Sequence, residues 1–587
     1  MYERTFSTDP SRASAPPSLR PAVMGHRHMV SAGHYLAAEA GFRTLEAGGN
    51  AVDAGVAAGI ALGVVQSDLV NFAGVAPIMI RRAKARDVVT IDGLGVWPKG
   101  ISLDLFVKEH GGAIPPGILR TIVPAAPDAW LTALERFGTM SFGEVASDAI
   151  RFARDGFAMH ALMAELIREN AEGYRRWPSN AAIYLPGGRA PQVGERFVQK
   201  DLARTLQYMA DEEKRAARRG GRKRGLKAAR DAFYRGDIAK AITDFQRKNG
   251  GFLTSADMAA YRVELGAPVR YRFRGIDVYA CGPWCQGPVL LQMLSILDGI
   301  DLGTLGHNSV EYVHLLAEAM KLAFADRERH YADPRFARVP IAALLSRGYA
   351  AERRALIRAL EAWPEMPQAG DPKGRARRET TAAPRAAKGE PMVLDTSYVA
   401  VVDRHGNAFS ATPSDSSWHV PVVPGTGLAP SGRGYQSWAK PSHPQAVAPG
   451  RRPRLTPNPA LAVREGHFVM PFGTPGGDVQ CQAMLQSFLN IAVFGMDVQQ
   501  AVEAPRFATF SFPNSFEPHT YYPGRLNLEG ALGSERGERL SALGHKVEWW
   551  PERTWRAGGM CMVAKDEKTG LLSGGADPRR PSYAVGW

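Results

Sequence analysis

The chain has few cysteines and no long apolar run. Only four of its 587 residues are cysteine, too few for a disulfide framework in a chain of this length. Cys281 and Cys285 have no second pair at a zinc-site spacing, so the sequence predicts no metal site. The longest apolar stretch, 54–65, is too short to span a bilayer, and residues 1–30 contain no apolar segment of signal-peptide length. We therefore expect a soluble cytoplasmic protein with no membrane partner.

The positive charge of the chain is local. The net charge is +14, and much of the excess lies in residues 212–233 and 372–390. A surplus of this kind can indicate nucleic-acid binding, but no zinc-finger spacing, RNA-binding aromatic signature or heptad zipper accompanies it. We interpret the two stretches as a solvated helix and a flexible loop, and expect no nucleic-acid partner.

Several familiar catalytic motifs are missing. The sequence has no G-x-S-x-G elbow, no phosphate-binding P-loop and no H-E-x-x-H pair. The Gly-rich "GGNAVDAG" lies between two helical patterns and not after a strand, which argues against a dinucleotide site. No cofactor is expected.

The hydrophobic patterns predict alternating helices and strand pairs. Residues 1–30 read as a disordered leader, and 363–392, rich in Ala, Arg, Pro, Lys and Glu, reads as a linker. Helical patterns and period-two strand pairs occupy both sides of that linker, which favours a layered α/β architecture. Helices are expected within 34–66, 124–172, 199–249, 287–299 and 309–333, and strand pairs within 77–93, 269–283 and 396–414. Residues 466–495 are expected to form a strand, a Gly-rich turn and a helix.

An Asp-Thr pair ends the linker at the head of a strand. A threonine hydroxyl becomes a useful nucleophile when a free terminal amine beside it acts as general base. An unperturbed α-amine has a pKa of about 8, close enough to neutrality to accept a proton. Thr396 has such an amine only if the Asp395–Thr396 bond is cut. The alternative, from these residues alone, is an ordinary threonine at the start of a strand.

The turn "FGTPGG" (472–477) links a predicted strand to a predicted helix. Amide N–H groups of Gly476 and Gly477 would point into the space ahead of the helix N-terminus, as in an oxyanion hole. Glycine permits the backbone angles that this needs. A Gly-rich turn is common, so this motif alone is weak evidence.

Ordered motifs from about residue 35 to the C-terminus resemble the γ-glutamyltransferase (glutathione hydrolase) family of N-terminal nucleophile hydrolases. They are "AGGNAVDAGVAAGIAL", "RFARDGF", "FYRGDIAKAI", "KNGGFLTSADMAAY", "AEAMKLAFADRERHYADP", "DTSYVAVVDRHGNAFSAT", "PFGTPGG", "VEAPRF" and "GADPRRPSYAVGW". The resemblance implies a four-layer αββα sandwich. It also implies a precursor cut between Asp395 and Thr396 into large (31–395) and small (396–587) segments that share one intertwined domain. Thr396 is then the processing and catalytic nucleophile, Gly476 and Gly477 form the oxyanion hole, and Ser414 supplies a supporting hydroxyl.

The substrate-anchoring positions depart from the family pattern. Leu94 stands at the position of the arginine that takes the α-carboxylate, and Leu455 and Thr456 at its serine pair. Gln436 is nearest the aspartate that takes the α-amine, and Ser416 falls where an asparagine is usual. A carboxylate buried against leucine would cost several kcal/mol. These changes favour an acyl group other than a standard γ-glutamyl one, with Arg433 or Arg454 as a relocated anion site; the alternative for each arginine is an ordinary surface charge.

The main interpretation is a self-processing threonine amidohydrolase or acyltransferase for a small-molecule amide. It needs no cofactor or metal, keeps its two segments associated and is compatible with a homo-oligomer. A second hypothesis is a processing-dead binding protein on the same fold that contacts anionic polymers through 212–230. A third is a serine or cysteine hydrolase that uses Cys281 or Cys285, although no catalytic base is near either in sequence.

Overall fold

Two antiparallel sheets form the centre of the protein. The computed structural model describes residues 18–372, 386–387, 389–391 and 396–587. Within these residues each of the two sheets has seven strands. The first sheet has the order β1 (Val23–Gly25), β18 (Leu572–Ala576), β17 (Cys561–Asp566), β13 (Phe468–Gly473), β12 (Ala460–Arg464), β9 (Ile276–Ala280), β8 (Val269–Phe273). The second has the order β19 (Tyr583–Gly586), β2 (Met29–Ala32), β10 (Val399–Val402), β11 (Ala408–Ala411), β3 (Ile78–Arg82), β4 (Asp87–Ile91), β7 (Leu265–Gly266).

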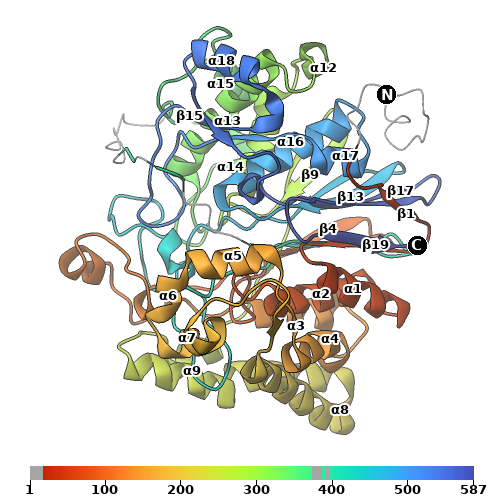
Figure 1. The fold of residues 1–587 in the computed structure, drawn as a ribbon, viewed down its shortest axis with the longest axis vertical. Helices are drawn as coiled ribbons and strands as arrows, with labels where there is room; N and C mark the ends of the chain where they lie inside the picture. Colours follow the sequence, from red (N-terminus) through yellow and green to blue (C-terminus); the bar gives the residue numbers. More distant parts are fainter. Residues whose placement is uncertain (1–17, 373–385, 388, 392–395) are drawn as a thin grey trace.

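The central strands of both sheets are buried on both faces, as their continuous apolar sequences require. Along β10, Val399 and Val401 pack into the helix-side core, while Ala400 and Val402 face the core between the sheets. The first sheet shows the same alternation, with Ala460 of β12 on its helix side. Successive side chains of a strand point to opposite faces, so this division places one helical layer outside each sheet. The predicted αββα order is confirmed (Figure 1).

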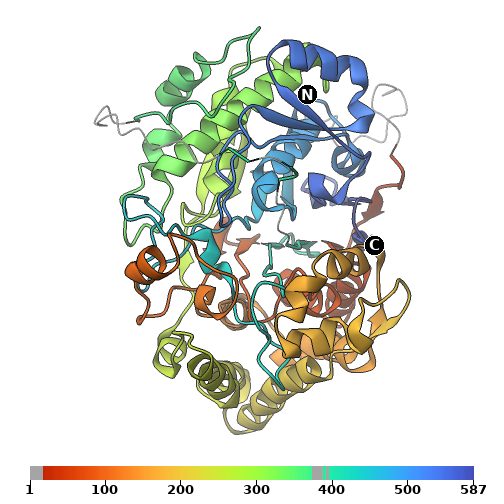
Figure 2. The ribbon, with the colours of Figure 1, turned by 60° about the vertical axis from the view of Figure 1, so that its left-hand side comes forward.

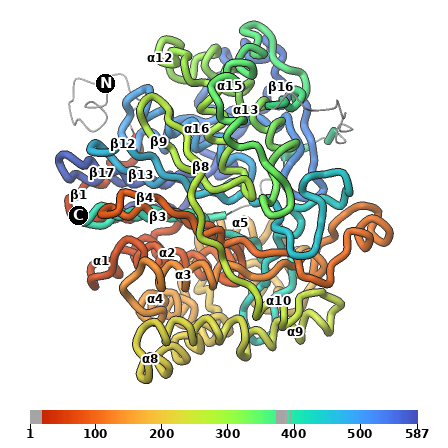
Figure 3. Tube along the Cα trace, turned by 180° about the vertical axis from the view of Figure 1, so that it is seen from behind, coloured from red at the N-terminus to blue at the C-terminus, as the bar shows by residue number. Residues whose placement is uncertain are grey.

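A helical layer covers each sheet, as the view from behind also shows (Figure 3). Against the second sheet lie α1 (Tyr35–Glu46) and α2 (Ala51–Val65), and α3 (Ala126–Phe137) and α4 (Phe142–Asp155) pack on α2. The same side of the molecule also contains α5 (Ala161–Glu169), α6 (Ala171–Arg175), α7 (Pro178–Tyr184), α8 (Lys200–Tyr234), α9 (Asp237–Lys248) and α10 (Ser255–Ala260). The layer of the first sheet contains α11 (Gly287–Leu297), α12 (Leu302–Leu305), α13 (Val310–His330), α14 (Ile341–Leu344), α15 (Arg347–Arg354), α16 (Gln480–Ala492), α17 (Val498–Glu503) and α18 (Ser534–Ala542). Smaller sheets pair β14 (Phe507–Thr509), β15 (Arg525–Glu529) and β16 (Lys546–Trp550), and β5 (Phe157–Ala158) with β6 (Arg196–Phe197). None of the described helices combines the length and hydropathy needed to cross a membrane.

Helix α2 is buried along its whole length and depends on its glycines. A Cβ on Gly55 would lie 2.1 Å from the Phe409 ring of β11, so this glycine lets the helix approach the sheet closely. A Cβ on Gly59 would instead meet Trp130 of α3 at 2.5 Å. Gly55 therefore serves the close approach of α2 to the sheet, whereas Gly59 serves its contact with a neighbouring helix.

Both large sheets mix strands from before and after Thr396. The first sheet joins β1, β8 and β9 to four strands that follow residue 396, and the second joins β2, β3, β4 and β7 to three. Green and blue elements likewise share the upper helical layer (Figure 2). A cut before Thr396 would therefore leave two segments that remain interleaved in one core.

The structure corrects the expected extent of the disordered leader. Val23–Gly25 form β1, and the backbone N–H groups of Leu19 and Arg20 donate to the Glu503 carboxylate at 2.5 and 3.1 Å. A three-residue strand is too short to show a period-two pattern in the sequence, which explains the error. Residues 1–17, Asp395, and 373–385, 388 and 392 of the expected linker lie outside the described residues.

Candidate active site

Thr396 lies at the head of β10, near the middle of the second sheet, and is 1% exposed. The pairing of β10 with β11 sets Val399 opposite Ala411. The same register continues outward and sets Thr396 opposite Ser414, with their hydroxyl oxygens 2.9 Å apart. A slip of one residue would turn the threonine side chain to the other face of the sheet. The tight turn at Asp403–Asn407, closed by a bond of 3.1 Å from Asp403 N–H to Asn407 O, fixes that register.

Polar side chains continue from Ser414 in an unbroken chain. The guanidinium of Arg433 donates from Nη2 to Ser414 Oγ, and its Nη1 lies 3.4 Å from Gln436 Oε1. Gln436 then donates from Nε2 to Thr456 Oγ1 at 3.1 Å. All of these side chains are buried. Four residues that the sequence analysis named as site candidates are thus connected to Thr396, although they come from three separate stretches of chain: Ser414, Arg433, Gln436 and Thr456.

Asp415 is a member of this site that the sequence did not indicate. Its φ of 128° is in the left-handed region, which a non-glycine residue adopts at a cost of about 1 to 3 kcal/mol. Its carboxylate accepts from Ser431 Oγ at 2.6 Å and lies 3.4 Å from Arg433 Nε. Burial raises the pKa of Asp415, and the charge of Arg433 opposes that rise. Asp415 therefore balances the arginine that contacts Ser414.

The glycine turn lies beside the nucleophile. A Cβ on Gly473, the last residue of β13, would lie 2.3 Å from the ring of Tyr398, and Gln480 Nε2 lies 3.5 Å from Thr396 Oγ1. Gly476 and Gly477 have φ of 123° and 55°, which explains why both are glycine. Within the part of the chain that the structure describes, neither of their N–H groups has a hydrogen-bond acceptor. They are therefore free to donate to a developing oxyanion.

Gln286, which the sequence did not indicate, ties the glycine turn to the Thr456 segment. Its Nε2 donates to Gly477 O at 2.9 Å and to Thr456 O at 3.0 Å, while its Oε1 accepts from Arg327 at 3.1 Å. Gln286 is fully buried. It therefore fixes the turn that carries the N–H donors relative to the rest of the site.

Arg454, the second candidate anion site, reaches the site only indirectly, through Glu328 and Arg327, which contacts Gln286. Its Nη2 donates to Glu328 Oε1 at 2.6 Å, and Arg327 also lies against Glu328. Burial alone would raise the pKa of Glu328, but the two guanidinium groups outweigh it and hold the pKa far below its usual range. The charge of Arg454 is thus balanced within the protein, and of the two arginines only Arg433 is connected through Ser414 to the nucleophile.

Two of the positions expected to clamp an α-amino acid, Leu94 and Leu455, are apolar. Leu94 and Leu455 are both fully buried and belong to the same apolar cluster, which also holds Trp97. The Tyr261 hydroxyl donates to the backbone carbonyl of Leu94 at 3.0 Å. Ser416 is also buried, next to Asp415 in the chain. The structure therefore provides no cationic side chain at the Leu94 position.

The cysteine alternative finds no support in the geometry. Cys281 and Cys285 are buried, and burial raises the pKa of the Cys285 thiol well above its ordinary value. A thiol in this state is not a nucleophile at neutral pH, because reactivity requires the thiolate.

A cluster of His314, Glu318 and His545 has ligand atoms within 4.8 Å of one another. However, Lys321 donates to Glu318 at 2.7 Å, and His314 Nδ1 and His545 Nε2 already share a hydrogen bond of 2.9 Å. A divalent cation there would add charge beside a buried ammonium group. We interpret the cluster as a structural network and not as a metal centre.

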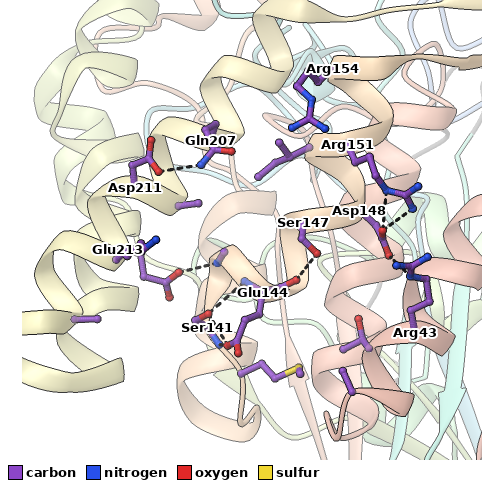
Figure 4. Close-up of a pocket in the computed structure, with 18 of the residues that line it drawn as sticks. Arg43, Ser141, Glu144, Ser147, Asp148, Arg151, Arg154, Gln207, Asp211 and Glu213 are labelled. Atoms are coloured by element: carbon purple, nitrogen blue, oxygen red, sulfur yellow. Dashed lines mark hydrogen bonds and ion pairs between the residues drawn. The ribbon is translucent and has the colours of Figure 1, made fainter.

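A surface groove of about 1150 Å³ lies between α4 and α8, away from Thr396. Figure 4 shows that its labelled carboxylates already have partners: for example, Asp148 lies 3.4 Å from Arg43 and 2.7 Å from Arg151, and Glu213 caps the start of α4. None of the predicted site residues lines this groove. It is therefore not the candidate active site.

Comparison with known proteins agrees with this geometry. The family model described as gamma-glutamyltranspeptidase matches residues 37–587. The chain belongs to this family. Its fold is that of the N-terminal nucleophile hydrolases, and the chain is an enzyme of the gamma-glutamyltranspeptidase family.

The similar proteins include acylases and glutathione hydrolases. The chain is 36% identical to "Acylase ACY 1 proenzyme" of Pseudomonas sp. (strain SE83), over 94% of this chain and 92% of that one. It is 32% identical to "Glutathione hydrolase-like YwrD proenzyme" of Bacillus subtilis (strain 168), over 96% and 99%. Among solved structures, LmbA2991HD matches with a TM-score of 0.90 and 38% identity, over 97% and 100%. Cephalosporin acylase from Bacillus halodurans matches with 0.83 and 29%, over 99% of each chain.

Proposed function

We propose that the protein is a self-processing amide hydrolase or acyltransferase in which Thr396 is the nucleophile. The observation that supports this most is the placement of the Thr396 hydroxyl. The Thr396 Oγ1 atom lies 2.9 Å from Ser414 Oγ, at the head of β10. This strand packs against Gly473 at the end of β13. Gly476 and Gly477 follow β13, and among the described residues their N–H groups have no acceptor. The names of the similar proteins, acylase and glutathione hydrolase proenzymes, favour this activity over the processing-dead binding protein.

Self-processing requires an N-to-O acyl shift. The Thr396 hydroxyl oxygen attacks the carbonyl carbon of Asp395, the peptide C–N bond breaks, and the nitrogen takes a proton to become the α-amine of Thr396. The resulting ester joins the Asp395 acyl group to the threonine oxygen. Water then hydrolyses the ester, releases the Asp395 carboxylate and restores the hydroxyl. Ser414, held by Arg433, orients the hydroxyl during this step.

Turnover repeats the same chemistry on an external amide. The new α-amine accepts the hydroxyl proton as the oxygen attacks the substrate carbonyl, and Gly476 and Gly477 donate to the oxyanion. The tetrahedral intermediate expels the amine product, which takes the proton back from the α-ammonium. The acyl-enzyme ester then passes its acyl group to water or to an amine acceptor.

The side chains near the nucleophile favour an acyl group that is not a free α-amino acid. A γ-glutamyl group carries both an α-carboxylate and an α-ammonium. Here leucine stands at the arginine position, and the neutral amide of Gln436 stands at the aspartate position. Leaving the α-ammonium without a carboxylate, or the α-carboxylate without a cation, costs several kcal/mol in a buried site. We infer that the substrate is an amide of a simpler acid, in keeping with the acylases among the similar proteins.

A paired assay tests this proposal. Purified protein is incubated with three 4-nitroanilides, those of the γ-carboxyl of glutamic acid, of glutaric acid and of an unbranched monocarboxylic acid, and the release of 4-nitroaniline is followed. The covalent adduct is located by mass spectrometry. We expect an acyl adduct on the peptide that begins with Thr396, and faster release from the two acids without an α-amine. Preferred turnover of the γ-glutamyl anilide contradicts the substrate assignment, and an adduct on any other residue contradicts the mechanism. Thr396→Ala is the control, and it should give one uncut chain and no adduct.

A further inference from the structure

The segment Tyr521–Arg525, just before and at the start of β15, holds the stretch of chain that leads to the processing site. Ala387 N–H donates to Tyr521 O at 2.8 Å, and Ala386 forms a parallel bridge with Tyr521. The Tyr522 hydroxyl donates to the backbone carbonyl of Glu390 at 3.0 Å. These contacts engage the backbone, so they fix the path of the chain at Ala386, Ala387 and Glu390 whatever the side chains there are.

Arg525 adds the strongest contacts of this set. Its Nη1 donates to Gly389 O at 2.6 Å and its Nη2 to Glu390 Oε1 at 2.8 Å. Nε donates to Asn527 Oδ1 at 2.8 Å, which fixes the plane of the guanidinium. The Arg525 side chain is 9% exposed whereas Glu390 is 62% exposed. A buried and braced arginine of this kind presents a preformed surface onto which the more exposed chain docks.

The same segment also holds the start of the expected linker. The Met366 N–H donates to the Tyr521 hydroxyl at 2.7 Å. A Cβ on Gly524 would lie 2.9 Å from the Pro364 carbonyl oxygen, so the chain passes close against it. Just upstream, Trp363 is fixed by Glu318 and Lys321 at 3.0 and 2.8 Å. The segment Tyr521–Arg525 thus contacts the chain that precedes Thr396 at two places, before residue 373 and after residue 385.

We propose that Tyr521–Arg525 is a docking clamp that positions the chain for scission before Thr396. Glu390 is six residues from Thr396, a stretch that spans at most about 20 Å when extended. Docking Glu390 shortens the free stretch of chain before Thr396, so we expect the scissile bond to meet the Thr396 hydroxyl more often than it would on a longer free stretch. Tyr522 and Arg525 are positioning residues for processing, and they have no part in the turnover of an external amide. The inference rests on the proposed self-processing at Thr396.

The rate of self-cleavage tests this clamp. Full-length chain is made by cell-free translation, quenched at intervals and separated on a gel, for the wild type, Arg525→Ala, Tyr522→Phe and Arg539→Ala. Arg539, in α18, is an exposed arginine that forms an ion pair with Glu311 of α13, and it serves as the matched control. Turnover per cleaved molecule is then measured on fully processed protein.

We expect Arg525→Ala to slow cleavage at least about tenfold, because it removes two charge-assisted contacts to the docked chain, and Tyr522→Phe to slow it about threefold. Arg539→Ala should cleave at the wild-type rate, and turnover per cleaved molecule should stay within about twofold for all four proteins. Cleavage of both clamp variants at the wild-type rate overturns the proposal, as does a parallel loss of cleavage and turnover. If Arg525→Ala does not fold, Tyr522→Phe, which lacks one hydroxyl group, decides alone. A wild-type chain that never cleaves contradicts the proposed function itself, which separates the two failures.

Discussion

At the scale of single residues, Arg433 is the group that distinguishes this site. It is buried, it contacts Ser414 and Gln436 from the two ends of one guanidinium fork, and Asp415 balances its charge. Only a planar group with several N–H donors can make these contacts at once. Its position in the chain of contacts from Thr396 to Thr456 links the nucleophile to the residues expected to meet the acyl group.

Replacing Arg433 with lysine keeps the charge and removes the fork. We expect kcat/KM to fall about 10- to 100-fold, because a single ammonium group cannot hold Ser414 and Gln436 together. The same change at Arg539, on the surface, should alter kcat/KM by less than about twofold. Steady-state kinetics of the two variants on the preferred anilide measure the difference, and equal values for both would remove Arg433 from the mechanism.

At the scale of elements, the strand register does most to build the site. Thr396 and Ser414 meet because the β10–β11 hairpin carries its pairing beyond the last strand residues. This part is predictable from sequence, since the period-two patterns and the Asp-Arg-His-Gly-Asn turn both indicate a hairpin. Asp415, Arg433 and Gln436 come from an irregular stretch between β11 and β12, which has no periodicity to read. The approach of Arg433 and Gln436 to Ser414 depends on tertiary packing, and the sequence pointed to these two residues only through family resemblance.

Helix α2 offers a test of the packing that supports this hairpin. Gly55→Ala should lower the free energy of unfolding by about 1 to 3 kcal/mol, because the added methyl group collides with Phe409 of β11. Gly348, in α15, is a helical glycine whose added methyl group would meet no heavy atom within 4 Å. Gly348→Ala should be neutral or stabilise by up to about 1 kcal/mol.

Urea unfolding monitored by circular dichroism compares these two variants. A Gly55→Ala protein as stable as the wild type would show that α2 does not pack on the sheet as closely as described.

At the scale of the whole molecule, one core is shared by the two segments, and it buries several neutral histidines. Burial lowers the pKa of His545 to about 2, of His419 to about 3, and of His160 and His519 to about 4. Burial acts in the opposite direction on Glu517, whose pKa it raises to about 7, and on Asp92, whose pKa it raises to about 6.

The histidines make the protein sensitive to acid. Below about pH 6.5, the unfolded-state pKa of histidine, these histidines bind protons in the unfolded chain but not in the folded one. The free energy of unfolding therefore falls as the pH drops. Each such histidine contributes a loss of about 2 kcal/mol between about pH 6.5 and pH 5, and the two carboxyl groups offset part of the total. We expect the urea midpoint to fall steadily from about pH 7 to pH 5. A midpoint that is constant or rises over that range contradicts the assignment of neutral buried histidines.

The central claim is that the functional enzyme carries a free amine on Thr396. N-terminal sequencing of fully active protein, separated on a denaturing gel, tests it directly. The account predicts two fragments, of which the smaller begins Thr-Ser-Tyr, and an uncut, inactive chain for Thr396→Ala. Full activity in a single unbroken chain, or a smaller fragment that begins at any other residue, would contradict it.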